Sequence, residues 1–244
     1  MIKIENIHTC NWEAAIRSMR NAYNSWSLSD SGYGCEEGKV CRFCPHNFSP
    51  DWCGNNNDDY ILGPKDRKLA LTLAKSGTDH GKYLRSIIFS ADITAPMYWW
   101  KEMDTYKVGT VRNSCSTMHT VMKKPFAEED FSWDQIIVYT DANENDLKES
   151  TLEQLNHLRD EYLYYKSTPT KDVEKKNELM KKYWYTLIQL LPSSYNQKAT
   201  WTGNYAVLSN IYHARKNHKL DEWHEFCAMI EKLPYSELIT EARE

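Results

Sequence analysis

The segment from Ala95 to His119 combines apolar anchors with titratable groups, hydroxyls, amides and an imidazole. Pro96, Trp99 and Trp100 have the spacing of the buried side of a short helix. The polar groups after them are Lys101, Glu102, Asp104, Tyr106, Lys107 and the run Asn113-Ser114-Cys115-Ser116-Thr117-Met118-His119. Small-molecule sites set a few such groups on an apolar wall, because those groups orient the ligand. The segment therefore predicts a ligand site, and a buried helix followed by a polar loop is the alternative.

Four cysteines form a second group, with the spacing C-x5-C-x2-C-x8-C. They are Cys35, Cys41, Cys44 and Cys53. Four thiolates with one C-x2-C step can surround a tetrahedral Zn²⁺, and a bound metal would shape a loop that has no core. Structural zinc is therefore one hypothesis for this loop, with His46 able to replace one thiolate. Ordinary reduced cysteines and an iron–sulfur cluster are the other two.

The first group resembles the core of the flavin-dependent thymidylate synthases, the ThyX family. In that family an apolar strand leads to Ala-Pro, then to a helix with R-Q-x-x-R-H-R and to the turn S-x-N-E-x-S-x-R-Y. Aligned from Ala95-Pro96, the family's Arg-Gln falls on Lys101-Glu102 and its Arg-His-Arg on Thr105-Tyr106-Lys107. Its Asn-Glu-x-Ser falls on 112–115, or on 113–116 if one residue is inserted. Upstream, only His80 remains of the family's H-x-(S/T)-P-x-E-H.

A second block near the C-terminus resembles the same family. The family has Leu-Pro, a variable stretch, W-T-x-N, and then a helix with N-x-x-x-L-R. Here Leu191-Pro192, Trp201-Thr202-Gly203-Asn204 and the segment from Asn210 to Arg215 follow at the same spacing. The two blocks occur in the family's order and together cover roughly half of the chain. We therefore interpret the chain as a divergent member or a paralogue of the family.

The resemblance implies an α+β fold with a central antiparallel sheet and packed helices. It implies one domain over residues 1–244, with a Cys-rich insertion over residues 27–62 that the family's common pattern lacks. The related enzymes transfer a one-carbon unit from methylene-tetrahydrofolate to C5 of dUMP, with FAD as the electron carrier. The implied product carries a methyl or hydroxymethyl group, and the implied assembly is a homotetramer with shared sites.

The resemblance also assigns residues. Arg215 matches the family arginine that contacts the pyrimidine, and a cation beside the ring carbonyls would make C5 electron-rich. The implied nucleotide-binding residues are Lys101, Glu102, Ser114, Cys115, Ser116, His119 and Arg215. The implied flavin-binding residues are His80, Thr105, Tyr106, Lys107, Asn204 and Asn210. For each of them a plain structural role is the alternative, such as a solvated helix arginine at 215 or a capping amide at 210.

Two other functions compete with this enzyme. Most of the family's flavin and nucleotide arginines are replaced here, and lysine keeps the charge but loses the planar fork that grips phosphate. The replacements favour a nucleotide-binding paralogue that keeps the fold without flavin-dependent catalysis. The third function is a metal-stabilised interaction module that uses the cysteine loop as its contact surface.

Charge and hydropathy exclude several classes of partner. The chain has 244 residues and a formal net charge of −4, with lysine and arginine scattered along it. Nucleic-acid binding needs a basic face, so we expect no nucleic-acid partner. No stretch approaches about 18 consecutive apolar residues, and the first residues lack a basic region followed by an apolar run. We expect a cytoplasmic protein without a membrane partner, with its cysteines reduced or metal-bound.

Periodicity predicts the elements that must position these groups. Strands are predicted at 1–7 as an edge strand, at 85–93 from the alternation of Ile87, Phe89, Ala91 and Ile93, and at 108–112. Helices are predicted at 11–26 with Asn11 as N-cap, at 64–75 from Pro64 onward, and over the Trp-rich segment after Pro96. Further helices are predicted at 144–165, 172–191, 204–217 and 221–232, the first two forming a helical hairpin.

Overall fold

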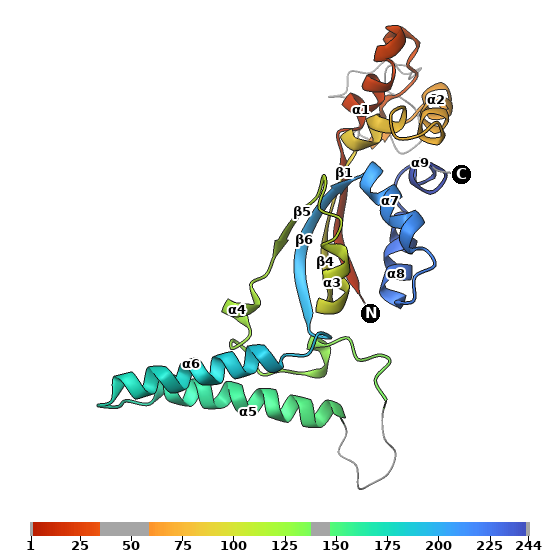
Figure 1. Cartoon of the computed structure of the whole chain (residues 1–244). Coiled ribbons are helices and arrows are strands. Elements are labelled where there is room, and N and C mark those ends of the chain that lie inside the picture. Colours follow the sequence, from red (N-terminus) through yellow and green to blue (C-terminus); the bar gives the residue numbers. More distant parts are fainter. Residues whose placement is uncertain (1, 35–58, 138–146, 243–244) are drawn as a thin grey trace. The chain divides into compact units, whose positions relative to one another are not determined.

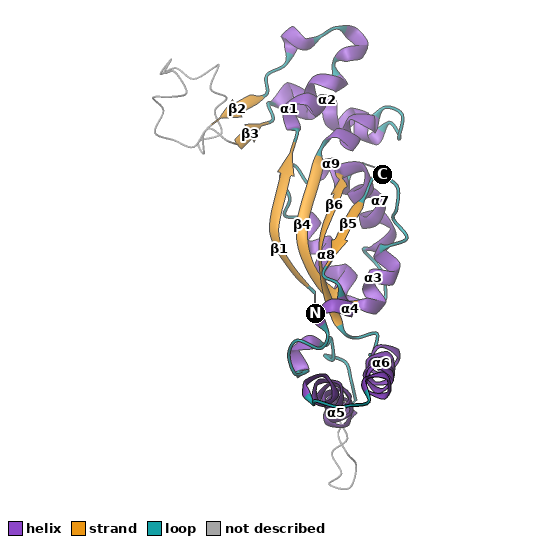
Figure 2. Cartoon of the chain, turned by 90° about the vertical axis from the view of Figure 1, so that its left-hand side faces the viewer, coloured by secondary structure: helices purple, strands orange, loops and turns teal. Residues whose placement is uncertain are grey.

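The computed structural model describes residues 2–34, 59–137 and 147–242 (Figures 1 and 2). By proximity of their backbones, the residues divide into two compact units. The first unit consists of residues 1–4, 92–105 and 113–200, and the second of residues 5–91, 106–112 and 201–244. Each unit is therefore assembled from segments that lie far apart in the sequence. The single domain expected over residues 1–244 stays a prediction.

The fold is α+β, with a four-stranded antiparallel sheet in the order β1-β4-β6-β5 (Figure 2). The strands are β1 (Lys3–Cys10), β4 (Ile88–Pro96), β6 (Asn196–Asn204) and β5 (Val111–Ser114). The alternation predicted for β4 is confirmed, because Phe89, Ala91 and Ile93 are buried while the residues between them are partly exposed. A period of two sends one set of side chains to the core face. The predicted edge strand is also confirmed, as β1.

Most helices of the second unit pack against α7 (Tyr205–Arg215) or its neighbours. The helices of this unit are α1 (Trp12–Met19), α2 (Pro64–Lys75), the 3₁₀ helix at Gly81–Ser86, α7, α8 (Asp221–Ile230) and α9 (Glu237–Thr240). Helix α7 packs against α8, α9 and the 3₁₀ helix. Trp223 and Phe226, three residues apart on α8, are fully buried and meet edge to face at 6.0 Å. The unit also contains the hairpin β2 (Gly32–Gly34) and β3 (Asp59–Ile61).

A buried ion pair ties α1 to α2. Arg20 Nε donates to Asp66 Oδ1 at 2.5 Å, and neither side chain is more than 6% exposed. The hydroxyls of Ser29 and Ser31 each donate to Asp66 Oδ2 at 2.6 Å. Burial by itself raises the pKa of Asp66, but the two serine hydroxyls and the Arg20 guanidinium outweigh it and leave the pKa below its ordinary value. The carboxylate is therefore charged and fully engaged at neutral pH.

The start of α2 depends on a close approach at Gly63. The carboxylate of Asp30 accepts from the backbone N–H groups of Lys65 at 2.9 Å and Asp66 at 3.0 Å, so it caps the helix that Pro64 opens. A Cβ at residue 63 would clash with the Asp30 carboxyl carbon. Only glycine fits this position while the cap is in place.

The first unit has its own core, with the helical hairpin α5 (Leu147–Ser167) and α6 (Val173–Leu190). Phe131 stacks on Trp133 with ring centroids 4.3 Å apart, and Leu155 of α5 and Leu187 of α6 pack in the same cluster. The predicted hairpin is confirmed, and Asp172 caps α6 by accepting from Lys175 N–H at 3.0 Å. The unit also contains α3 (Met97–Met103), α4 (Thr117–Thr120) and the 3₁₀ turn Glu128–Asp130.

Several predicted boundaries differ from the structure. The strand predicted at 85–93 begins at Ile88 and extends to Pro96, because the chain forms a 3₁₀ helix up to Ser86. The helix predicted over 11–26 ends at Met19 and is followed by the 3₁₀ turns Asn21–Tyr23 and Trp26–Leu28, because Arg20 turns inward to its ion pair. Asn11 precedes that helix at φ 67°, and its amide donates to Ser86 O instead of capping. The strand predicted at 108–112 begins only at Val111, after Gly109 at φ 76°. Strand β6 was not predicted.

Of the helices in the described ranges, none has both the length and the apolar character that a membrane span requires.

Candidate functional site

A pocket of about 430 Å³ in the first unit is lined by residues of the segment from Ala95 to His119 and by Leu191 and Pro192 of the second block. Its apolar wall consists of Met97, Met118, Ile188, Leu191 and Pro192. Its polar groups are Lys101, Ser114, Ser116, Thr117, Ser193 and Gln197. The residues come from α3, the end of β5, α4, the end of α6 and β6. An apolar wall with a few convergent polar groups is typical of a small-molecule site.

Buried tryptophans and backbone bonds hold α3 in place. Trp99 and Trp100 are buried and pack edge to face at 5.0 Å, as the sequence predicted for this helix. Trp100 Nε1 donates to Gln197 O at 2.8 Å. The N–H groups of Met97 and Tyr98 donate to carbonyls in the segment after Pro192, at 3.0 Å each. The helix therefore presents Met97 and Lys101 from a rigid base.

Gln197 fixes the polar turn opposite α3. Its Nε2 donates to Cys115 O at 2.9 Å and to Thr117 Oγ1 at 3.1 Å. The N–H of Cys115 donates to Lys198 O at 2.8 Å. These bonds hold the exposed residues Ser114 and Ser116 where α4 begins. Both serines can offer a hydroxyl to a ligand.

The charge of the pocket favours an anion. Lys101 is exposed, and the described residues include no carboxylate paired with it. The described lining contains no other charged side chain. Beside the pocket, burial together with nearby Asp130 and Cys115 raises the pKa of Tyr195, so its phenol is neutral at physiological pH. One lysine with four hydroxyls suits a phosphate bound less tightly than by an arginine fork.

In the second unit the predicted catalytic arginine, Arg215, lies against two aromatic rings. Arg215 Nε donates to Tyr106 Oη at 2.9 Å, and its guanidinium carbon lies 4.8 Å from the centroid of Trp223. The same carbon lies 5.6 Å from the centroid of Tyr106. Cation–π contact and the hydrogen bond both restrict the guanidinium to one orientation. The structure therefore brings together two residues that the sequence assigned separately, Arg215 and Tyr106.

Comparisons with known proteins identify the fold. No family model and no curated protein matches the sequence. Two crystal structures of the flavin-dependent thymidylate synthase ThyX from Helicobacter pylori, both complexed with FAD and dUMP, match it with a TM-score of 0.59. One is 16% identical over 99% of this chain and 100% of its own, and the other is 17% identical over 99% of each. The chain has a ThyX-like fold.

Some ThyX-like assignments fall outside the pocket of the first unit. Glu102, Cys115 and His119 belong to that unit but do not line its pocket. Thr105 donates to Glu102 O at 2.7 Å, beyond the end of α3. Lys107 and His80 are exposed residues of the second unit. The flavin contacts assigned to these residues stay predictions.

Two asparagines of the second block have distinct surroundings. Asn204 is buried and caps α7, accepting from Val207 N–H at 3.0 Å. Asn210 is exposed and lines a cavity of about 120 Å³ together with Thr78 and Arg85. Asn204 therefore has a structural role as the cap of this helix. The flavin contacts assigned to Asn204 and Asn210 stay predictions.

The metal hypothesis concerns residues outside the described ranges. Cys35, Cys41, Cys44 and Cys53 all lie within 35–58. Among the residues that the structure describes, no group of three or more His, Cys, Asp or Glu is arranged to hold a metal. The described cysteines Cys10, Cys115 and Cys227 are free, and burial raises the pKa of Cys227 to about 11.

Sequence reasoning missed Ser193 and Gln197. Both precede the W-T-x-N block in a stretch that varies in the family, and β6, which carries Gln197, was not predicted. One signal could have found Gln197: it lies four residues before Trp201, and residues an even number apart in a strand lie on the same face.

Replacing Gln197 with glutamate should weaken ligand binding more than it weakens the fold. The change keeps the shape of the side chain but removes the N–H groups that hold the turn. We expect the dissociation constant of a nucleoside monophosphate, measured by calorimetry, to rise about tenfold. Asn196→Ala is the control, because Asn196 accepts from Ser132 at 2.9 Å and does not line the pocket. Equal loss of affinity in both variants would contradict the role of Gln197.

Proposed function

We propose that this chain transfers a one-carbon unit, as methyl or hydroxymethyl, from methylene-tetrahydrofolate to C5 of a pyrimidine nucleotide such as dUMP, with FAD as cofactor. The observation that carries the proposal is the convergence of Lys101, Ser114 and Ser116, three residues selected from the ThyX resemblance, on one pocket. The match in fold to two ThyX structures that contain FAD and dUMP supports the same function. The volume of about 430 Å³ suits one nucleotide.

The residues of the pocket support a division of roles. Lys101 and the hydroxyls of Ser114 and Ser116 would bind the phosphate. The apolar wall would receive a flat ring and exclude water from one of its faces. Glu102, Cys115 and His119 would contribute at the rim of the nucleotide site.

The pocket of the first unit fits only part of an FAD molecule. A pocket of about 430 Å³ with one cation accommodates one nucleotide-sized body, so the two halves of FAD would need a second surface. The flavin contacts that the resemblance implies, and that we propose, are His80, Thr105, Tyr106, Lys107, Asn204 and Asn210. Flavin reduced by an external reductant would supply the hydride that converts the transferred methylene to methyl, whereas addition of water without reduction would leave hydroxymethyl.

Arg215 is the proposed catalytic residue. The attack of C5 on the one-carbon unit is favoured when a cation polarises the carbonyls of the uracil ring. The Tyr106 hydroxyl and the Trp223 ring orient the Arg215 guanidinium, which reduces the entropy lost when it meets a substrate.

The visible spectrum of the purified protein tests the proposal first. The protein should be yellow or become yellow on titration with FAD. Incubation with dUMP, methylene-tetrahydrofolate and a reductant should then give a nucleotide that is heavier by one methyl or hydroxymethyl group in mass spectrometry. Colourless protein that takes up no FAD and forms no such nucleotide would overturn the proposal.

A nucleotide-binding paralogue without flavin is the second candidate. Lysine stands at positions 101 and 107 where the family has arginine, and a lysine binds phosphate as a point charge without the bidentate fork. This candidate predicts that dUMP binds to the protein while FAD does not. Calorimetric titration with each of the two compounds separates the candidates.

The proposed assembly follows the same resemblance. We propose a cytoplasmic homotetramer with shared sites, built from one ThyX-like domain per chain. Sedimentation of the purified protein measures the assembly directly. A monomer that is fully active would contradict shared sites.

A further inference from the structure

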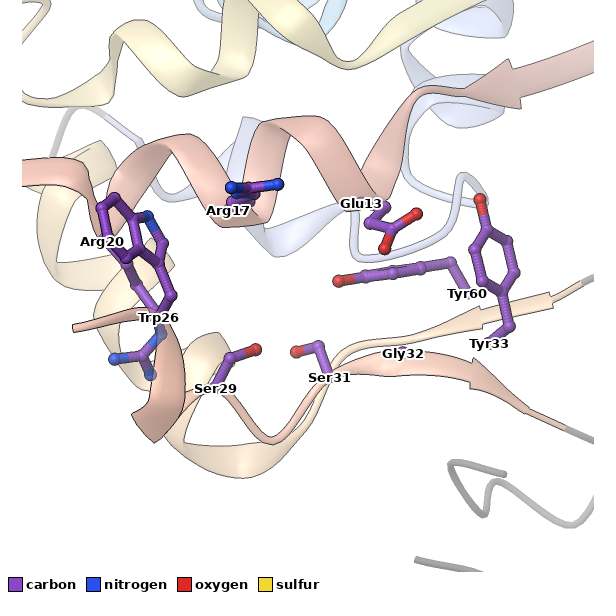
Figure 3. A pocket seen from close by; sticks show the side chains of 9 residues that line it. All are labelled: Glu13, Arg17, Arg20, Trp26, Ser29, Ser31, Gly32, Tyr33 and Tyr60. Carbon is purple, nitrogen blue, oxygen red and sulfur yellow. The ribbon is translucent and has the colours of Figure 1, made fainter. Parts of the chain in front are cut away.

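The second unit contains a pocket of about 320 Å³ that the proposed reaction does not use. It lies between α1, the 3₁₀ turn Trp26–Leu28 and the β2–β3 hairpin (Figure 3). All of its lining residues belong to the second unit. Their chemistry indicates which kind of molecule the pocket accepts.

Aromatic rings line both ends of this pocket. Trp26, 44% exposed, is anchored by a bond of 2.8 Å from its Nε1 to Asn21 Oδ1, and the Arg17 guanidinium lies 5.9 Å above its ring. At the other end Tyr33, 49% exposed, meets Tyr60 edge to face at 5.4 Å (Figure 3). The open ring faces can cover an apolar side chain or a cation.

Two opposite charges face the pocket without neutralising each other. Glu13 and Arg17 are exposed and lie four residues apart on α1, a spacing at which ion pairs commonly form. Within the described residues neither side chain forms an ion pair. Figure 3 shows Glu13 on the side of Tyr60 and Arg17 on the side of Trp26. A ligand with two separated charges could therefore satisfy both.

The floor of the pocket offers acceptors and no net charge. Arg20 is neutralised by the buried carboxylate of Asp66. Ser29 and Ser31 each donate their single hydroxyl proton to that carboxylate at 2.6 Å. Their hydroxyl protons are therefore not available to a ligand. Ser31 Oγ also accepts from the N–H of Gly63 at 3.0 Å. The floor therefore offers no hydroxyl donor and favours a ligand that brings N–H donors of its own.

We propose that this pocket binds a free α-amino acid with a flat or bulky apolar side chain. The ammonium group would bind Glu13 and the serine oxygens, and the carboxylate would bind the fork of Arg17. The side chain would lie against Trp26 or Tyr33. A zwitterion matches the zero net charge of the lining, whereas a nucleotide phosphate would leave Glu13 unmatched and close to a like charge.

Titration of the full-length protein with phenylalanine tests the proposal by ligand-observed NMR and calorimetry. Two derivatives locate the charges: N-acetyl-phenylalanine lacks the ammonium group, and phenylalanine amide lacks the carboxylate. Free phenylalanine should bind, and each derivative should bind at least about tenfold more weakly. Absence of phenylalanine binding, or binding of either derivative as tight as that of phenylalanine, would overturn the proposal.

Variants connect the binding to the pocket. Glu13→Gln and Arg17→Gln should each weaken phenylalanine binding by about tenfold or more, while Lys68→Gln, an exposed charge on α2 outside the pocket, should not. Uptake of FAD and dUMP should be unchanged in Glu13→Gln, so failure here is distinguishable from failure of the proposed reaction. Unchanged phenylalanine binding in both pocket variants, or nucleotide binding that depends on Arg17, would refute the site.

Discussion

Replacing Asp66 with alanine should lower the free energy of unfolding by about 3–5 kcal/mol, because it leaves the buried guanidinium of Arg20 without its counter-charge. The side chain of Asp66 is 0% exposed and also accepts from Ser29 and Ser31. Chemical denaturation followed by tryptophan fluorescence measures the loss. A loss below about 1 kcal/mol, the usual range of an exposed ion pair, would contradict the role given to this network.

The matched control for Asp66 is Lys75→Ala. Lys75 pairs with Glu241 at 2.9 Å, but both side chains are more than 40% exposed, so this change should cost less than about 1 kcal/mol. Acid provides an independent check. The folded-state pKa of Asp66 is lowered, so its stabilisation is present above the unfolded-state pKa and is lost as pH falls through the folded-state value. In Asp66→Asn this part of the pH dependence should disappear.

Replacing Lys101 with alanine should raise the dissociation constant of dUMP by about 10- to 100-fold, because a charge-assisted bond to phosphate contributes about 1.5–3 kcal/mol. Lys101 is the cation of the described pocket lining in the first unit. The fold should be unaffected, since this side chain is exposed. Calorimetric titration at two salt concentrations measures the effect. Added salt should weaken binding to the unaltered protein more than binding to the variant.

Lys198→Ala is the control for Lys101. Lys198 belongs to the same unit and lies 3.6 Å from Asp92, but it does not line the pocket. Its removal changes the net charge by the same amount. If both variants lost affinity equally, general attraction would explain the result and the assignment of Lys101 to the phosphate would be wrong.

Local signals predicted much of the fold. Pro64 and the residues after it gave the bounds of α2, and the alternation around Phe89 predicted β4. Strand β6 was missed although Ala199, Trp201 and Gly203 are buried in alternation, because alanine and glycine are too small to give a strong apolar signal. Its position beside β4 depends on pairing with strands that lie about a hundred residues away in the sequence.

The candidate site was predictable to the extent that the family resemblance reached it. The alignment with the family selects Lys101, Ser114 and Ser116, and all three line the same pocket. Ser193 and Gln197 enter it only through tertiary hydrogen bonds to α3 and to the turn at Cys115. The pocket beside Arg17 had no sequence signal, since its floor joins Ser29 and Ser31 to an aspartate more than thirty residues away.

The contact between Gly63 and Asp30 has a consequence for how this sequence can drift. A Cβ at 63 would collide with the carboxylate that starts α2 and also with the backbone carbonyl oxygen of Asp30. Shortening the side chain at 30 would remove the helix cap and still leave the clash with the backbone. Position 63 should therefore remain glycine in related chains, whereas position 30 should vary among residues that can cap a helix.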